Sequence, residues 1–358
     1  MFETLWVDID AAKARVWVEC YTVEPDRVGT RTIAALASAA RRGCDTLLFI
    51  DAVGSNTLAQ ADYAELLEAG GRVCIYNPRS RWLRRSPLNR NHRKLVVLDA
   101  SVGFVGGMNI SEHYAGSRYG LDTFRDCHLR IHGPACRLLE RSLAAMVRHG
   151  DFAHCPLPTP EAAIPEAPSE ASLDASGRSI VQLLESSASP GRREIQRELG
   201  VAIDAARVSV ELATPYFVPP QSLRQRLKAA ARRGVAVRLL TTGRSDVPLV
   251  ALAARHVYVD LLRSGVQIFE FDEPVLHAKV AIIDSMYAMV GSFNLDLWSN
   301  SRNLELNVGI VSPEVLARLH DQFEAWLDDS HEISLDGHRR RFWGRRLVEW
   351  AAYQLMRL

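Results

Sequence analysis

Two copies of one polar pattern contain the residues of this sequence that are best suited to chemistry. The pattern is H-x-K-x4-D-x6-G-x-x-N, and it runs from His92 to Asn109 and again from His277 to Asn294. Chance would match its fixed positions with a probability on the order of 10⁻⁷ per start. An imidazole can attack phosphorus or move a proton, while a lysine and a primary amide can bind anionic oxygens. The pattern therefore predicts chemistry on a phosphoryl group.

The lysine of the pattern is unusual for this chain. Of its 43 basic residues only four are lysines, and Lys94 and Lys279 occupy the same position in the two copies. A compact ammonium ion and a planar guanidinium bind oxygen with different geometry. We infer that this position requires the point charge of a lysine.

The elements around each copy must bring these side chains together. Residues 92–99 and 277–284 are expected to be strands, in which residues i and i+2 project to the same face, so that the His and the Lys point into one pocket. A turn at the Asp of each copy would return the chain. We expect this return to bring Asn109 and Asn294 near their own His and Lys.

An internal repeat surrounds the two copies. Residues 9–51 and 203–242 both read as an apolar strand, a Pro-containing turn, an amphipathic helix that closes on A-R-R-G, and a second strand. Strands that alternate with helices predict parallel neighbours in an α/β sheet. Gly43 and Gly234 are expected to follow the helix ends, where a residue with positive φ is favoured.

The chain is expected to divide at a segment that cannot form a core. Residues 156–177 are rich in Pro, Ala, Glu and Ser and contain no aromatic residue, which is typical of a flexible linker. The predicted domains are therefore residues 1–155 and 178–335. Residues 336–358 are predicted to form a basic amphipathic C-terminal helix.

Composition limits the class of protein. The 358 residues are 47% hydrophobic and 24% charged, with a formal net charge of +1, which is typical of a globular protein without a global attraction for polyanions. We find no signal peptide and no run of about 18 apolar residues, so a soluble body is expected. The six cysteines form no C-x-x-C pair, which favours free thiols in a reducing compartment. No cofactor and no metal are predicted, because H-x-K offers no second ligand.

Through these motifs the sequence resembles the phospholipase D superfamily, whose signature is the duplicated H-x-K-D pattern. The resemblance covers almost the whole chain and implies duplicated α/β domains, each a mixed β-sheet flanked by helices, with the active site at a pseudo-twofold interface. It also implies that one histidine forms a phosphohistidine, while the other protonates the leaving alcohol and then deprotonates the acceptor. His92 is the expected nucleophile and His277 the expected acid and base, with the reverse assignment left open.

The resemblance assigns further residues. Four of them would hold the non-bridging oxygens: Lys94, Lys279, Asn109 and Asn294. An imidazole in this role needs an orienting group on its other nitrogen, and the expected acids are Glu305, at the entry to a strand of the second half, and its counterpart Asp126. Asp99 and Asp284 are expected to be structural partners at the strand ends. Ser292 is expected to support the second histidine.

The C-terminal segment gives the best indication of the substrate. Five arginines lie within residues 339–346, at the start of an apolar helical stripe. The stripe consists of Trp343, Leu347, Trp350, Ala351, Leu355 and Leu358. Basic residues beside Trp and Leu are typical of a helix that lies in an anionic membrane interface, and a helix packed on the body of the protein is the alternative.

The favoured function is that of a phosphatidyltransferase similar to bacterial cardiolipin synthases, which the stretches GGMNISEHY and FRDCHLRIHGP resemble. We expect anionic phospholipid substrates and peripheral contact with the cytoplasmic side of a bacterial membrane through the C-terminal helix. A phospholipase D hydrolase is the main alternative, since water and an alcohol attack the same intermediate. The near-neutral charge disfavours a nuclease. A non-enzymatic scaffold would require broken motifs, and both are whole.

Overall fold

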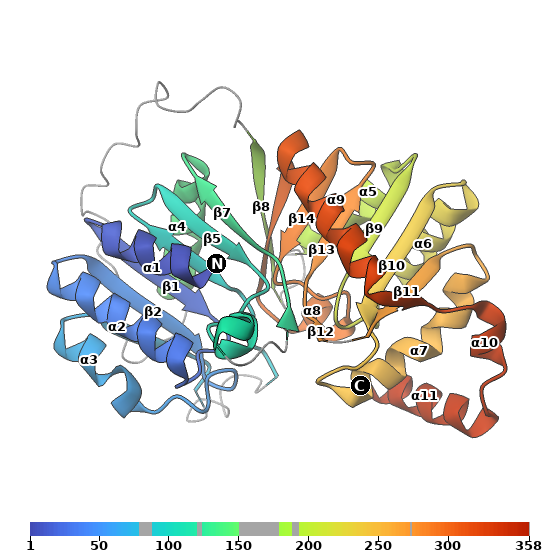
Figure 1. Ribbon diagram of the computed structural model, residues 1–358, viewed down its shortest axis with the longest axis horizontal. Coiled ribbons are helices and arrows are strands. Elements are labelled where there is room, and N and C mark those ends of the chain that lie inside the picture. The colour runs from blue at the N-terminus through green and yellow to red at the C-terminus, as the bar shows by residue number, and fades with distance from the viewer. Residues whose placement is uncertain (79–87, 120–123, 150–178, 188–192, 273, 358) are drawn as a thin grey trace. The chain divides into compact units, whose positions relative to one another are not determined.

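The computed structural model describes residues 1–78, 88–119, 124–149, 179–187, 193–272 and 274–357 (Figure 1). The predicted linker, residues 156–177, lies outside these ranges. The chain forms two compact units, and neither is a continuous stretch of sequence. Unit 1 consists of Met1–Thr123, His128–Arg178 and Asn303–Leu306, and unit 2 of Phe124–Cys127, Ser179–Arg302 and Asn307–Leu358. Each sequence half therefore contributes one short segment to the other unit. The predicted domains, residues 1–155 and 178–335, were continuous and did not include this exchange.

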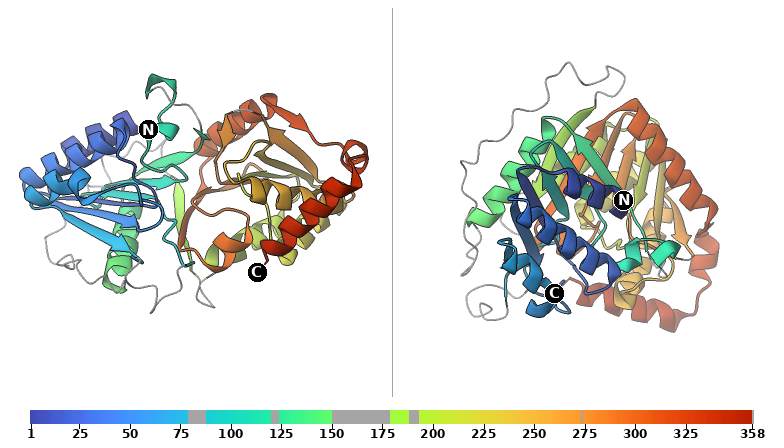
Figure 2. Two further views of the ribbon diagram at one scale, coloured as in Figure 1. Left: turned by 90° about the horizontal axis from the view of Figure 1, so that it is seen from below. Right: turned by 60° about the vertical axis from the view of Figure 1, so that its left-hand side comes forward.

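Unit 1 is built on a six-stranded sheet with the order β3-β2-β1-β4-β5-β7. The strands are β1 (Arg15–Cys20), β2 (Asp45–Asp51), β3 (Arg72–Tyr76), β4 (Leu95–Leu98), β5 (Val102–Gly106) and β7 (His128–His132). The helices are α1 (Phe2–Ala11), α2 (Arg27–Arg41), α3 (Ala64–Glu68) and α4 (Ala135–His149). Strands β1, β2 and β3 are parallel and the others antiparallel. Because α1, α2 and α3 lie over one face and α4 over the other (Figures 1 and 2), every residue of β1 is buried.

Unit 2 contains an eight-stranded sheet with the order β16-β11-β10-β9-β13-β14-β15-β8. Its strands are β8 (Ile180–Ser186), β9 (Ser209–Ala213), β10 (Ala236–Thr242), β11 (Gln267–Phe271), β13 (Val280–Ile283), β14 (Tyr287–Gly291), β15 (Glu305–Val311) and β16 (Ser330–Glu332). The helices are α5 (Glu194–Ala205), α6 (Gln221–Arg232), α7 (Pro248–Leu262), α8 (Leu297–Ser301), α9 (Pro313–Asp328), α10 (Leu335–Arg339) and α11 (Trp343–Leu355). A separate short pair joins β12 (Val275–Leu276) to β6 (Phe124–Arg125).

The two sheets confirm the duplication. The order β3-β2-β1-β4-β5-β7 of unit 1 recurs in unit 2 as β11-β10-β9-β13-β14-β15, with β16 and β8 added at the two edges. The repeated helices α2 and α6 both end before a glycine with φ of 91°, Gly43 and Gly234, as the A-R-R-G ending predicts. The fold class, duplicated α/β domains with mixed sheets flanked by helices, is therefore confirmed.

Asp99 and Asp284 occupy tight turns that join the two antiparallel strands after each motif. Each has φ near 50°, as has the residue after it, a conformation that Asp tolerates better than most residues. The Asp99 carboxylate accepts hydrogen bonds from three successive amides at the start of β1, at 2.7 to 2.9 Å, and Asp284 does the same at the start of β9. Burial raises the pKa of Asp284, but the hydrogen bonds from the three amides together outweigh burial, so that the pKa lies below its usual value. This geometry supports a structural role for both.

The C-terminal segment forms two helices, α10 and α11, instead of one. Figure 1 shows α11 beside α7. Ala352 and Tyr353 of α11, and Met356 directly after it, belong to the core of unit 2. The opposite side of α11 carries the predicted apolar stripe at the surface, with Trp343 70% and Trp350 49% exposed. The helix therefore packs on unit 2 and still presents an apolar face, so the two alternatives for this segment are compatible. Leu358 lies outside the described residues.

No helix within the described ranges has both the length and the apolar character needed to cross a membrane.

The cysteines differ from expectation at one position. Cys20, Cys44, Cys127 and Cys136 are free thiols, and burial raises the pKa of Cys127 and of Cys136 to about 12, so these two are neutral at physiological pH. Cys74 is disulfide-bonded, and Cys155 lies outside the described residues. The prediction of free thiols throughout was therefore wrong, and the cysteines no longer indicate a reducing compartment.

Candidate active site

The first motif lies in unit 1, immediately before β4. This strand begins only at Leu95, later than the expected start at residue 92. The backbone around His92 pairs instead with the segment that unit 1 receives from the second sequence half. The His92 amide donates to the Leu304 carbonyl at 3.0 Å, and the Leu304 amide donates to the Arg90 carbonyl at 2.9 Å. The exchanged segment thus holds the motif histidine in place from one side.

The His92 imidazole is buried and is oriented by a carboxylate. Its Nδ1 lies 3.1 Å from Oε2 of Glu305, whose side chain is completely buried. The other oxygen of Glu305 accepts a hydrogen bond from Asn303 at 3.2 Å. The edge of the Tyr21 ring packs against the imidazole, with 5.0 Å between the ring centroids. Burial raises the pKa of Tyr21 to about 12, so its hydroxyl stays protonated at neutral pH.

The lysine and the asparagine of the first motif both lie against the segment that contains Tyr21 and Thr22. Lys94 Nζ donates to the His92 carbonyl at 2.7 Å and lies 5.2 Å from the centre of the Tyr21 ring. The side-chain oxygen of Asn109 accepts a hydrogen bond from the Thr22 backbone amide at 3.3 Å, and its side-chain nitrogen donates to the Tyr114 hydroxyl at 2.9 Å. We call His92, Lys94, Asn109 and Glu305 the first half-site.

The second motif lies in unit 2 and repeats this arrangement. The His277 amide donates to the Arg125 carbonyl at 2.6 Å, next to the pairing of β12 with β6. His277 Nδ1 lies 2.7 Å from Oδ2 of Asp126, and the side chain of Asp126 is completely buried. We call His277, Lys279, Asn294 and Asp126 the second half-site.

The second half-site differs from the first in its lysine. Lys279 Nζ lies 2.7 Å from Nδ1 and 3.3 Å from Nε2 of the His277 ring, and it also donates to the His277 carbonyl. The same ammonium group lies 3.9 Å from the Asp126 carboxylate. Lysine, imidazole and carboxylate therefore form one compact buried group.

Aromatic rings flank His277 as well. The Phe124 and Tyr216 rings lie 5.3 and 6.3 Å from the imidazole, centroid to centroid, and the Tyr216 hydroxyl donates to Asp246. Asn294 is 3% exposed, and its side-chain oxygen accepts no hydrogen bond from any described residue. Ser292, which is part of the second motif, is completely buried.

The orienting acids are exchanged between the two sequence halves. Glu305 of the second half contacts His92, while Asp126 of the first half contacts His277. The sequence contains both acids but no sign of this exchange, because it depends on two short segments that join the other unit. The contacts of Tyr21 with His92 and of Tyr216 with His277 were not predicted from the sequence. The common position of the two tyrosines, after the first strand of each repeat, is the one signal that could have indicated them.

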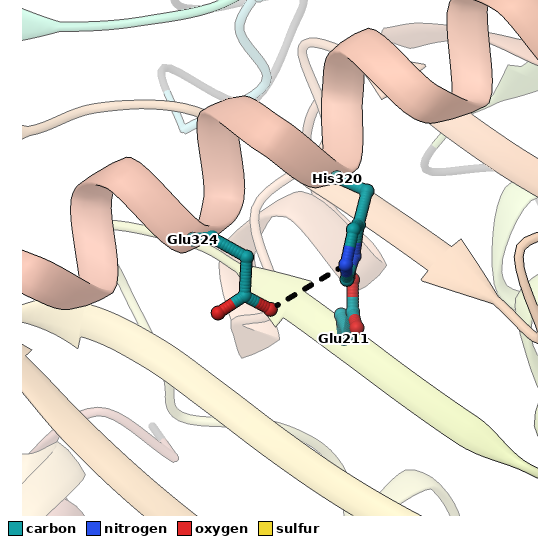
Figure 3. Close-up of side chains that lie close together, drawn as sticks. All are labelled: Glu211, His320 and Glu324. Carbon is teal, nitrogen blue, oxygen red and sulfur yellow. Dashed lines mark hydrogen bonds and ion pairs between the residues drawn. The ribbon is translucent and has the colours of Figure 1, made fainter.

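One group with the composition of a metal site lies elsewhere in the described part of unit 2. Glu211 of β9 and His320 and Glu324 of α9 bring their ligand atoms within 4.8 Å of one another (Figure 3). However, Arg238 pairs with both glutamates at 2.5 Å, and its hydrogen bond is the main cause that lowers the pKa of Glu324. The guanidinium supplies the positive charge that a metal ion would bring, so we interpret the group as an ion-pair network that fastens α9 to the sheet.

A duplicated sheet of this order, with an H-x-K histidine beside a buried carboxylate in each unit, defines an enzyme of the phospholipase D superfamily. The family described as cardiolipin synthase, PLD-like domain, matches residues 5–123 and 199–327. The chain belongs to this family.

Individual proteins agree with this assignment. The chain is 32% identical over 357 residues to cardiolipin synthase 2 of Bacillus anthracis, covering 99% of this chain and 68% of that protein. It is equally similar to a cardiolipin synthase of Geobacillus sp. (strain WCH70), over 97% of this chain and 68% of the relative. The crystal structure of a phosphatidylserine synthase from Haemophilus influenzae superimposes with a TM-score of 0.66 at 12% identity, covering 98% of this chain and 92% of that one. At that identity the structure supports the fold alone.

The burial of the motif lysines predicts that arginine will not replace them. Lys94 and Lys279 are only 2% and 3% exposed, so a larger planar guanidinium has neither the space nor the geometry of an ammonium ion. We expect Lys94→Arg and Lys279→Arg each to lower turnover about 10²- to 10³-fold, the loss typical of one oxyanion-stabilising group.

Lys228 is the matched control for this substitution. It is also buried, and it pairs with Asp260 at 2.6 Å outside both motifs. Steady-state turnover in Lys228→Arg should stay near that of the unmodified enzyme. Near-normal rates in both motif variants would show that charge alone is needed.

Proposed function

We propose that this enzyme transfers a phosphatidyl group between phospholipids through a phosphohistidine, making cardiolipin from phosphatidylglycerol. The observation that carries the proposal is the pair of buried histidines, each with Nδ1 beside a carboxylate and with a lysine two residues along, in a chain of this family. Two histidines with separate orienting acids suit a reaction that needs a nucleophile and a proton carrier.

The proposed reaction has two displacements on one phosphorus atom. Nε2 of one imidazole, His92 in our assignment, attacks the phosphorus of the donor lipid, and the bond to glycerol breaks as the second imidazole gives its proton to the leaving oxygen. The second imidazole then takes the proton of an acceptor hydroxyl. That oxygen attacks the phosphohistidine and releases the first imidazole. In both steps Lys94, Lys279, Asn109 and Asn294 stabilise charge on the non-bridging oxygens.

The orienting acids have a defined task in this scheme. With Nδ1 beside Glu305 or Asp126, Nε2 is the nitrogen of each ring that attacks phosphorus or transfers the proton, and the carboxylate stabilises the imidazolium form. Lys279 Nζ lies 3.3 Å from Nε2 of His277, within reach of a phosphoryl oxygen bound there. Both carboxylates are completely buried, which strengthens these interactions relative to water. The assignment of His92 as nucleophile is part of the proposal.

Labelled phosphatidylglycerol in vesicles tests the proposed function. We expect labelled cardiolipin and free glycerol as products, and added glycerol should reverse the reaction because it competes as acceptor for the same intermediate. Release of phosphatidic acid without cardiolipin would instead identify a phospholipase D hydrolase, with water as acceptor.

We further propose that the exposed face of α11 attaches the enzyme to the surface of an anionic membrane. Trp343, Leu347 and Trp350 are 70%, 54% and 49% exposed, at the i, i+4, i+7 spacing of one helical stripe. Arg345 and Arg346 lie in the first turns of the same helix. Apolar and aromatic side chains flanked by arginines are typical of a helix in the interface plane. This attachment is peripheral, through one face of one helix.

Serine in place of Trp343 and Trp350 should weaken vesicle binding. Deleting the whole helix would also remove Ala352 and Tyr353 from the core, whereas these two exposed side chains can be changed with little loss of stability. We expect about tenfold lower affinity for phosphatidylglycerol vesicles from each substitution, measured by co-sedimentation. Met286→Ser is the control, since Met286 is 71% exposed in the turn after β13. Equal binding by all variants would refute the attachment.

A further inference from the structure

A groove of about 550 Å³ lies between α7 and the segment that contains α10 and α11. Its walls include Arg255 and Arg263 from one side and Arg341 and Arg346 from the other. The helices α7 and α11 lie side by side in both views (Figures 1 and 2). None of the residues that line the groove belongs to either motif, so the groove is separate from both half-sites.

The acids in and around the groove are neutralised by other residues. Glu349 pairs with Arg341 at 2.5 and 2.9 Å, and Asp260 pairs with Lys228 at 2.6 Å. Arg255, in turn, is bound by Glu270 at 2.9 and 3.0 Å. Arg263 and Arg346 form no ion pair with any residue that the structure describes, and both are exposed. The groove therefore has an excess of positive charge, carried by two arginines that can reach a ligand.

The charge of the groove comes from these arginines and not from its histidines. Burial is the main cause that lowers the pKa of His256 and of His338, and the pKa of His338 falls to about 4. Both imidazoles are therefore neutral at pH 7 and can act only as hydrogen-bonding groups. Arginine is well suited to a phosphate, because its planar fork donates two parallel hydrogen bonds.

The apolar part of the groove belongs to the proposed membrane face. Trp343, Leu347 and Trp350 line the same groove as the two arginines and are the exposed residues of the α11 stripe. A phosphate bound by Arg263 and Arg346 would thus lie beside side chains that favour the boundary between headgroups and acyl chains. A dissolved phosphate ion would gain nothing from these tryptophans.

From these observations we propose that the groove between α7 and α11 binds the phosphate headgroup of an anionic phospholipid in the bilayer, at a docking site separate from the catalytic one. Arg263 and Arg346 are the headgroup ligands, and Trp343 and Trp350 contact the lipid around it. The inference rests on the proposed function only in that the substrate is taken to be a membrane lipid. The groove gives the enzyme a second lipid-binding site, which stays occupied while substrate and product exchange at the histidines.

The test compares Arg263→Gln/Arg346→Gln with Arg137→Gln/Arg141→Gln in the full chain. The control removes two exposed arginines of α4 and changes the net charge equally. Binding is measured by co-sedimentation with phosphatidylcholine vesicles that contain phosphatidylglycerol, and in parallel with vesicles given the same charge by an alkyl sulfate. The groove variant should lose about 10- to 30-fold in affinity for the phosphatidylglycerol vesicles, and clearly less for the sulfate vesicles. The control should lose little for either, and both variants should turn over a small soluble phosphodiester normally.

Each other outcome counts against the proposal. Equal losses for both kinds of vesicle would mean that the arginines supply only general charge, and unchanged binding would remove the site altogether. If calorimetry with inorganic phosphate alone shows binding that the groove variant loses, while vesicle binding is unchanged, the groove is a site for a dissolved anion. Because vesicle binding does not require turnover, failure to make cardiolipin would refute the proposed function and leave this test intact.

Discussion

Turnover is expected to fall at least about 10³-fold in His92→Ala and by a similar factor in His277→Ala. The two residues are proposed to perform different steps, nucleophilic attack and proton transfer, so neither can replace the other. Each imidazole is also held by its own buried carboxylate. The measurement is the initial rate of cardiolipin formation from labelled phosphatidylglycerol.

An activated substrate separates the roles of the two histidines. Phosphatidyl-p-nitrophenol needs no acid to expel its leaving group, because nitrophenolate is already stable. If His92 is the nucleophile, His277→Ala should still release nitrophenolate once and accumulate a labelled phosphohistidine, which is stable to alkali and labile to acid. His92→Ala should release none. The opposite pattern would reverse the assignment, and label on neither variant would argue against a covalent intermediate.

A histidine outside the motifs provides the control. His331 is exposed and lies 2.7 Å from Asp272 in unit 2. His331→Ala should keep nearly full activity. If either motif variant were as active as this control, the two-histidine mechanism would be wrong.

The second large effect is expected from the exchanged acids. Glu305→Gln and Asp126→Asn keep the shape of the side chain but remove the charge that orients and stabilises the imidazolium. We expect each to lower turnover about 10²- to 10⁴-fold, as when an orienting carboxylate is made neutral in a catalytic triad. Substrate affinity should change much less than turnover, since neither acid is proposed to bind lipid.

Double-mutant cycles on protein stability test which acid contacts which histidine, and they do not require the variants to be active. The free energy of unfolding in urea is measured for Glu305→Gln, His92→Ala and the double variant, and then with His277→Ala in place of His92→Ala. Residues in contact couple by about 0.5–3 kcal/mol, and separated residues by much less. Glu305 should couple to His92 and not to His277, and Asp126 should show the reverse. Coupling within each sequence half instead would contradict the exchange.

The motifs and the repeat predicted much of this protein because they depend on local physics. The identical spacing in His92–Asn109 and His277–Asn294 follows from two short antiparallel strands joined by a tight turn, whose length fixes which residues meet. The A-R-R-G endings predicted the glycines with positive φ that follow α2 and α6. The alternation of strands and helices predicted the α/β class, and the sheet order confirmed that the unit is duplicated.

The C-terminal segment shows what local periodicity does not predict. Its periodicity predicted an apolar stripe and a helix, and both are present in α11. The pattern did not predict that residues of the other face, such as Tyr353, would complete the core of unit 2 against α7. A helix with apolar residues on two faces can satisfy two partners, and periodicity alone does not indicate which face meets the protein.

By itself, the sequence determined the reactive side chains, their duplication and the α/β class, because each of these follows from residue types at fixed short spacings. Only the tertiary structure decided how the acids are shared, with Glu305 on His92 and Asp126 on His277. These pairs join residues 213 and 151 positions apart, and they form because two segments, Phe124–Cys127 and Asn303–Leu306, belong to the unit opposite their own sequence half. Contacts at such separations depend on the packing of whole sheets, which no local spacing records.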